Sequence, residues 1–422
     1  MDLTLYTLRS VASAIIGPSI IVVILLGVMF YFKNKKISFM QKMIVGESIN
    51  SPLELTLSQI VLGIFAGAIG SLLLTYFGIM FNENSRIEWL FLVSMLLMLY
   101  KPRFVCFSYS GAIIGALTLI LTFIYGEQSP IKLDIVHLVM VVGIIHIVEG
   151  FLVIIDGSRG AIPVFTNKNG KILGGFALNR YWSLPIAVLI IMNSSGSYIG
   201  TQSVGTPDWW PILNHSYTLD ILKTAIIGLF PYYGVVGYSS ITFSSTKREK
   251  TLLSGSLISL YGILLCGVAL IAGLGIAGSI IALIFMPLAH EAMLRLSSYI
   301  EEKKSPIYTS DEEGICVLEV APRSPAFDVG IKSGDKILGI NEEIISNEAE
   351  IYKIVKESFN DVKLKVKNIN GIICDYTLKP DINRRIGVVL VPKMVKQEDA
   401  MPLDNDFRSV LEKVRNRKNN KE

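Results

Sequence analysis

Long apolar runs, separated by short polar loops, fill the first 300 residues of the chain. A helix needs about 20 apolar residues to cross the hydrocarbon core of a bilayer. Seven runs are long enough, and two shorter runs are compatible with short, tilted or re-entrant segments. The long runs cover residues 11–32, 57–81, 104–125, 133–155, 219–243, 251–271 and 275–297, and the short ones cover 88–100 and 181–193. The pattern predicts an α-helical polytopic membrane bundle over residues 1–300.

Positive charge is divided unequally between alternate loops. If all nine runs cross and the N-terminus lies outside, the outer side holds only Arg9, Arg86 and Lys132, and its longest loop carries Trp209 and Trp210 instead. The remaining basic loops are then all internal. They contain Lys33, Lys35, Lys36 and Lys42; Lys101 and Arg103; Arg159, Lys168, Lys171 and Arg180; and Lys247, Arg248 and Lys250. Omitting one short run puts basic loops on both sides. We therefore expect nine crossings and a cytoplasmic C-terminus.

Composition agrees with a membrane part followed by a soluble part. Of the 422 residues 51% are hydrophobic and only 18% are charged, against about 25% in soluble proteins. The net charge of +4 is small, and we interpret it as loop charge that orients the bundle, not as a nucleic-acid surface. The four cysteines form no CxxC or Cys/His metal spacing. We expect no metal, no other cofactor and no catalytic residues.

Glycine pairs with a spacing of four occur in two of the apolar runs. They are Gly63 with Gly67 and Gly111 with Gly115. Such pairs allow two helices to approach closely. We expect them to pack helices within the bundle, and the alternative is a homo-oligomer built on the same motif.

Ionisable residues inside apolar runs are candidate functional groups. They are His146, Glu149, Asp156, His290 and Glu291. His146 and Glu149 lie three apart and so share a helix face. One interpretation is polar ties between helices, and the other is a proton path or chemical site. His290-Glu291 begins like the zinc-protease motif HExxH, but leucine replaces its second histidine.

Three segments follow the bundle. We expect a charged linker at 301–313, a folded module at 314–392, and a charged, flexible tail at 393–422. The residue pattern of this module predicts strands at 314–320, 336–340, 362–366, 372–378 and 386–391, with helices at 326–329 and 347–358. Its residues Ser324-Pro325-Ala326, Gly330-Ile331, Gly334-Asp335, Ile337 and Ile340-Asn341 resemble the signature of bacterial PDZ domains.

The resemblance to PDZ domains implies that an extended peptide binds by strand addition beside a helix. The residues that would form this site are Gly387, Val388 and Val389 on the last strand, with Ile351 and Val355 on the helix. No Gly-hydrophobic-Gly loop precedes residue 314, which leaves a second interpretation open. In that one the module binds internal surfaces or only docks on the membrane part.

Several stretches resemble the cell-division topological determinants of the MinJ family. They are residues 145–150, 156–164, 170–176, 237–241 and 286–291, together with the PDZ signature. The resemblance implies a non-enzymatic membrane scaffold of Gram-positive bacteria that connects a polar DivIVA-like protein to a MinD-like protein. Such a scaffold acts in division-site selection and gathers at septa and poles. Its partners are other proteins and the lipid bilayer, without nucleic acid.

Two other functions stay open from the residues alone. One is a PDZ-bearing receptor in secretion or stress signalling. The other is an intramembrane protease or transporter that uses the ionisable residues of the bundle. Site-2 intramembrane proteases also carry PDZ domains, but this chain departs from them in motif, in order and in the expected side of the PDZ domain.

Overall fold

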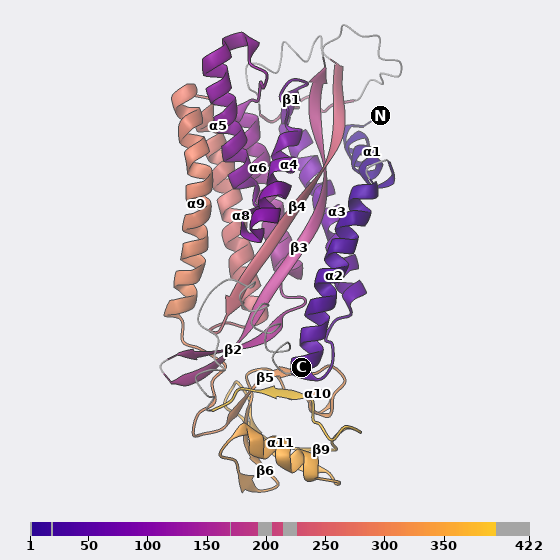
Figure 1. Cartoon of the computed structure of the whole chain (residues 1–422), viewed down its shortest axis with the longest axis vertical. Helices are drawn as coiled ribbons and strands as arrows, with labels where there is room; N and C mark the ends of the chain where they lie inside the picture. The colour runs from indigo at the N-terminus through magenta and orange to yellow at the C-terminus, as the bar shows by residue number, and fades with distance from the viewer. Residues whose placement is uncertain (1, 18–19, 169, 193–204, 214–225, 394–422) are drawn as a thin grey trace.

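The computed structural model describes residues 2–17, 20–168, 170–192, 205–213 and 226–393. Most of them form a long body of helices, and a small α/β domain lies at one end of that body (Figure 1). The expected charged tail lies outside the described residues, apart from its first position.

The helical membrane part expected from the apolar runs is confirmed in kind. Five helices are long and apolar enough to cross a membrane, and the bent pair α1–α2 would add a sixth if it forms one span. Nine helical spans are not found in the described ranges. The helices are α1 (Leu3–Ile16), α2 (Ile20–Val45), α3 (Pro52–Phe77), α4 (Glu88–Tyr100), α5 (Phe107–Tyr125), α6 (Ile135–Asp156), α8 (Lys247–Ala272) and α9 (Ile276–Lys303), with short 3₁₀ turns η1 (Pro102–Val105) and η2 (Gly126–Gln128).

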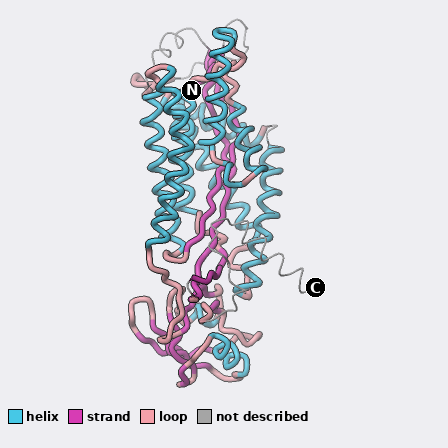
Figure 2. Tube along the Cα trace, turned by 60° about the vertical axis from the view of Figure 1, so that its left-hand side comes forward, coloured by secondary structure: helices cyan, strands magenta, loops and turns pink. Residues whose placement is uncertain are grey.

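Two of the runs expected as helices are β-strands. β3 (Lys171–Met192) contains most of the run at 181–193, and β4 (Ile226–Thr242) takes up the described part of 219–243. They pair antiparallel over the whole of β4 and run between helices on either side (Figure 2). The helix prediction was wrong because an apolar run that is buried on both faces lacks the periodicity that separates strand from helix.

The free edge of β3 is covered by protein along its length. At one end β1 (Met80–Asn82) pairs with it in parallel, and at the other end β2 (Ile162–Lys168) pairs antiparallel. β3 is buried from Ile172 to Ile190. Strand edges that face lipid would leave unpaired amides and carbonyls, so the helices around the hairpin take the place of neighbouring strands.

Helix α3 covers the middle of β3 because it carries glycine there. A Cβ atom on Gly63 would lie 2.0 Å from the carbonyl oxygen of Ser183, and one on Gly67 would lie 2.1 Å from that of Pro185. This glycine pair does pack elements within the bundle, as expected, but its partner is a strand and not a second helix. The second pair does pack helices: Gly115 faces Leu283 of α9.

The C-terminal domain has each element predicted for the PDZ-like module. A sheet in the order β10-β5-β6-β8-β9, with β7 on β6, encloses a hydrophobic core of its own. The elements are β5 (Ile315–Val320), α10 (Pro325–Asp328), β6 (Lys336–Ile340), β7 (Glu343–Ile344), α11 (Glu348–Glu357), β8 (Val362–Lys367), β9 (Ile373–Leu378) and β10 (Val388–Leu390). Helix α9 runs to Lys303, so the expected linker at 301–313 begins as helix.

The C-terminal domain docks on the membrane part through one face of its sheet. Leu318 and Val391 pack against Gly174 of β3, where a Cβ atom would lie 3.0 Å and 2.8 Å from their side chains. The Gly174 amide donates to the carbonyl of Tyr308 at 2.8 Å, and Lys247 pairs with Glu319. Leu318 and Val391 thus belong to the core that contains the membrane part, whereas α11 packs on the separate core of the C-terminal domain.

Candidate functional site

The residues expected to bind a peptide lie where α11 packs against β10. Ile351 and Val355 of α11 are 0% and 2% exposed and share the core of the domain with Val388. Val389 points the other way and belongs to the core that contains the membrane part. The structure thus brings three of these side chains together and assigns Val389 to the docking face, because successive side chains of a strand alternate.

Gly387 forms the turn that leads into β10. Its φ of +77° is a left-handed conformation that favours glycine, and a Cβ atom there would lie 2.2 Å from the Cβ of Ser324. Its carbonyl accepts the amide of Ala321 at 2.7 Å. Any side chain at 387 would therefore displace the start of β10.

Tyr352 closes the outer edge of β10. Its hydroxyl donates to the carbonyl of Val388 at 3.4 Å and accepts the amide of Leu390 at 3.2 Å. Burial raises the pKa of this phenol, so the hydroxyl keeps its proton near neutral pH. An added peptide strand would bond to the same two backbone groups. Tyr352 was not among the expected site residues, and it must move before a peptide can pair with β10.

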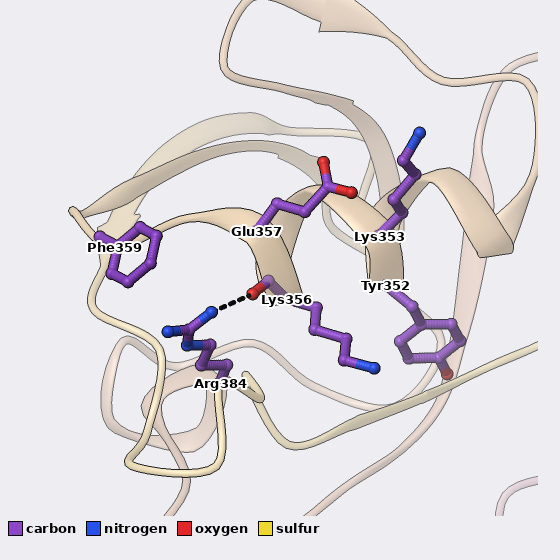
Figure 3. Close-up of a pocket in the computed structure, with 6 residues that line it drawn as sticks. All are labelled: Tyr352, Lys353, Lys356, Glu357, Phe359 and Arg384. Carbon is purple, nitrogen blue, oxygen red and sulfur yellow. Dashed lines mark hydrogen bonds between the residues drawn. The ribbon is translucent and has the colours of Figure 1, made fainter.

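A basic pocket adjoins this edge (Figure 3). It is open, with a volume of about 580 Å³. The Arg384 guanidinium lies 4.2 Å from the centre of the Phe359 ring and donates to the carbonyl of Lys356 at 3.3 Å. Three of its six lining residues are cationic, which suits a carboxylate or acidic side chain. The pocket is lined by Tyr352, Lys353, Lys356, Glu357, Phe359 and Arg384. Sequence reasoning missed the pocket, although basic residues on the helix and before Gly387 were available as a signal.

The contact of Tyr352 with the outer edge of β10 can be tested without a ligand. In Tyr352→Phe the Leu390 amide loses its partner, and we expect its hydrogen exchange to become about fivefold faster, because one hydrogen bond of about 1 kcal/mol is removed. The Val391 amide bonds to Cys316 of β5 at 2.8 Å and serves as the internal control. Exchange–mass spectrometry of the full chain would measure both. Equal rates at Leu390 in the two proteins would contradict the role of Tyr352.

The ionisable residues of the bundle fall into separate sites. Asp156 is fully buried and bonds to Arg180 of β3, whose Nε donates to it at 2.9 Å, and to Trp182, whose Nε1 also donates at 2.9 Å. Glu291 pairs instead with Arg103 and accepts the hydroxyl of Tyr109. These two acids act as ties between elements.

His146, Glu149 and His290 do come together. The His146 Nε2 atom lies 4.0 Å from a Glu149 carboxylate oxygen, and the two imidazole rings are 5.9 Å apart. Cys106, at the start of α5, joins them with its Sγ atom 3.0 Å from His146 Nε2. Cys106 was not expected at a site because its partners lie in other helices, so no local spacing marks it.

Known proteins resemble this chain in both of its parts. The PDZ domain model matches residues 296–367. The cell division topological determinant MinJ of Bacillus subtilis (strain 168) is 24% identical over 242 residues, which cover 53% of this chain and 55% of that protein. The probable cell division topological determinant MinJ of Lacticaseibacillus paracasei is 22% identical over 87 residues, or 20% of this chain and 24% of the relative. The chain thus matches about half of the first relative's length, and it is MinJ-like and carries a PDZ domain.

Proposed function

We propose that this protein is a non-enzymatic membrane scaffold in division-site selection. On this proposal its PDZ domain captures a protein partner by strand addition to β10. The observation that carries the proposal is the outer edge of β10. Its Val388 carbonyl and Leu390 amide both bond to the Tyr352 hydroxyl, beside a pocket with three cationic side chains. The likeness to MinJ supplies the process. A DivIVA-like polar protein and a MinD-like protein are the proposed partners.

We also propose that the chain crosses the membrane nine times, with the hairpin β3–β4 supplying two of the passes. The β2–β3 hairpin, which carries Lys168 and Lys171, and the start of α8, where Lys247 pairs with Glu319, lie at the end of the body nearest the PDZ domain (Figure 1). Basic loops stay on the cytoplasmic side, which supports a cytoplasmic PDZ domain. Trp209, exposed at 57%, belongs to the opposite loop.

Labelling of intact cells tests this topology. Single cysteines would be placed at two exposed positions in a cysteine-free chain, Ser346 in the PDZ domain and Asn84 before α4. We expect an impermeant maleimide to label Asn84→Cys and to leave Ser346→Cys unlabelled until the cells are opened. Labelling of Ser346→Cys in intact cells would put the PDZ domain outside and remove the cytoplasmic division partners.

Binding to the proposed partners tests the function. The full chain in nanodiscs would be titrated with the DivIVA-like and MinD-like proteins of the same organism. Lys356→Glu reverses a charge in the pocket, and we expect at least one partner to bind about tenfold more weakly, a loss of about 1.4 kcal/mol. Lys365→Glu, exposed on β8, is the matched control and should bind as the unchanged chain does. If neither partner binds, or if both variants bind equally, the scaffold proposal fails and a receptor for other peptides becomes the better interpretation.

A further inference from the structure

Three metal-ligating side chains converge inside the bundle from three separate helices. Cys106 comes from the start of α5, His146 from α6 and His290 from α9. All three are buried, and one ligand atom from each lies within 4.8 Å of the others. The Sγ atom of Cys106 also accepts the amide of Ser108 at 3.4 Å.

In both imidazoles a hydrogen bond made by Nδ1 leaves the other ring nitrogen, Nε2, unprotonated. The Nδ1 atom of His146 lies 2.7 Å from the carbonyl of Val142. Only a protonated nitrogen can bond to a carbonyl, so the lone pair is on Nε2, the atom nearest Cys106. A second partner of this kind is the rule for metal-binding histidines because it sets the tautomer.

His290 is oriented through a tyrosine. The Tyr109 hydroxyl donates its one proton to Glu291, so His290 Nδ1, at 3.3 Å from that hydroxyl, must be the donor to it. The lone pair of His290 is then on Nε2 as well. One nitrogen of each imidazole and the thiol sulfur therefore lie within 4.8 Å of one another, and a bound metal ion would displace the thiol proton.

We propose that Cys106, His146 and His290 bind one transition-metal ion, with Zn²⁺ as the best match. Zinc takes sulfur at about 2.3 Å and histidine nitrogen at about 2.0–2.1 Å in a tetrahedron. Its ligand atoms are then about 3.3–3.6 Å apart, which small side-chain rotations can reach from the present arrangement. The proposal is independent of the division partners and concerns a different part of the chain from β10 and α11.

Charge balance favours the Glu149 carboxylate, which lies outside the group of three ligand atoms, as a fourth ligand. The Glu149 carboxylate lies 4.0 Å from His146 Nε2 and is 7% exposed. A thiolate and a carboxylate together neutralise a divalent cation. Burying a neutral site in apolar surroundings costs much less free energy than burying a charged one. The ion would fasten α5 and α6 to α9, the helix that continues toward the PDZ domain.

Metal binding by the full chain in detergent tests the proposal. After stripping with a chelator, we expect about one Zn²⁺ per chain, and with Co²⁺ a thiolate-to-cobalt charge-transfer band in the near ultraviolet. Cys106→Ser should lose the band and the zinc. Cys266→Ser, on α8, is the matched control and should keep both. A band that survives Cys106→Ser, or no saturable binding to the unchanged chain, would overturn the site.

A measurement without variants guards against a misfolded mutant. X-ray absorption at the zinc edge of the unchanged chain should give one sulfur and two or three nitrogen or oxygen neighbours. A shell of nitrogen and oxygen alone would mean that the three side chains form a hydrogen-bonded cluster and that zinc binds elsewhere.

Discussion

Replacing Gly67 with alanine should destabilise the membrane part by about 2 kcal/mol or more. The new Cβ atom would lie 2.1 Å from the carbonyl oxygen of Pro185, far inside contact distance, and neither backbone can rotate away. β3 would have to shift against the helices on its other side. Overpacking of this kind costs about 1–3 kcal/mol and sometimes more, and the gain of up to about 1 kcal/mol from replacing a helical glycine offsets only part of it. Thermal unfolding of the purified chain in detergent would measure the loss.

A glycine-to-alanine substitution at an open helix position should not lower the stability of the protein. Gly267 lies in α8, and a Cβ atom there meets nothing within 4 Å. In Gly267→Ala the gain in helix propensity is unopposed, so we expect equal or slightly higher stability. If both alanine variants were equally stable, the close approach of α3 to β3 would be wrong.

Features that depend on residues close together in the sequence could be predicted from it. The order of elements in the PDZ domain follows from local alternation and from turn residues such as Asn370-Gly371, and each predicted element is present. Long apolar runs likewise identified the membrane part. In both cases the information needed lies within one segment, which is where pattern reasoning is strongest.

The hairpin could not be predicted because its stability depends on distant residues. β4 is rich in β-branched and aromatic residues, which favour a strand, although Pro231 is unfavourable inside strands and helices alike. A strand inside a membrane is nevertheless excluded unless its edges are covered. That cover comes from α3, where Ser71 accepts the amide of Ala187 at 2.9 Å. The residues close to the strands in the sequence do not indicate that α3 will cover the strand edge.

The same limit applied to the candidate sites. His146 and Glu149 were recognised as a pair because they share a helix turn, whereas Cys106 and His290 reach them only through the packing of α5 and α9 on α6. Tyr352 was missed for a related reason. The sequence places it on the exposed side of an amphipathic helix, and only the strand order of the sheet brings β10 against its hydroxyl.

Removing the guanidinium of Arg180 should cost about 3–5 kcal/mol of stability, because it leaves the buried Asp156 carboxylate without its main partner. Arg180 is 0% exposed and also bonds to the Ser58 hydroxyl and the Leu55 carbonyl, so it joins α3, α6 and β3.

We expect Arg180→Met to unfold at a much lower temperature, or at a much lower concentration of a denaturing detergent, than the unchanged chain. Adding Asp156→Asn should recover part of the loss, since no uncompensated charge then remains in the apolar interior. Arg159→Met is the control: its side chain is 49% exposed and 3.4 Å from the same carboxylate, and exposed ion pairs contribute about 1 kcal/mol or less. If Arg159→Met proved as damaging as Arg180→Met, burial would not decide how strongly each arginine stabilises the protein through Asp156.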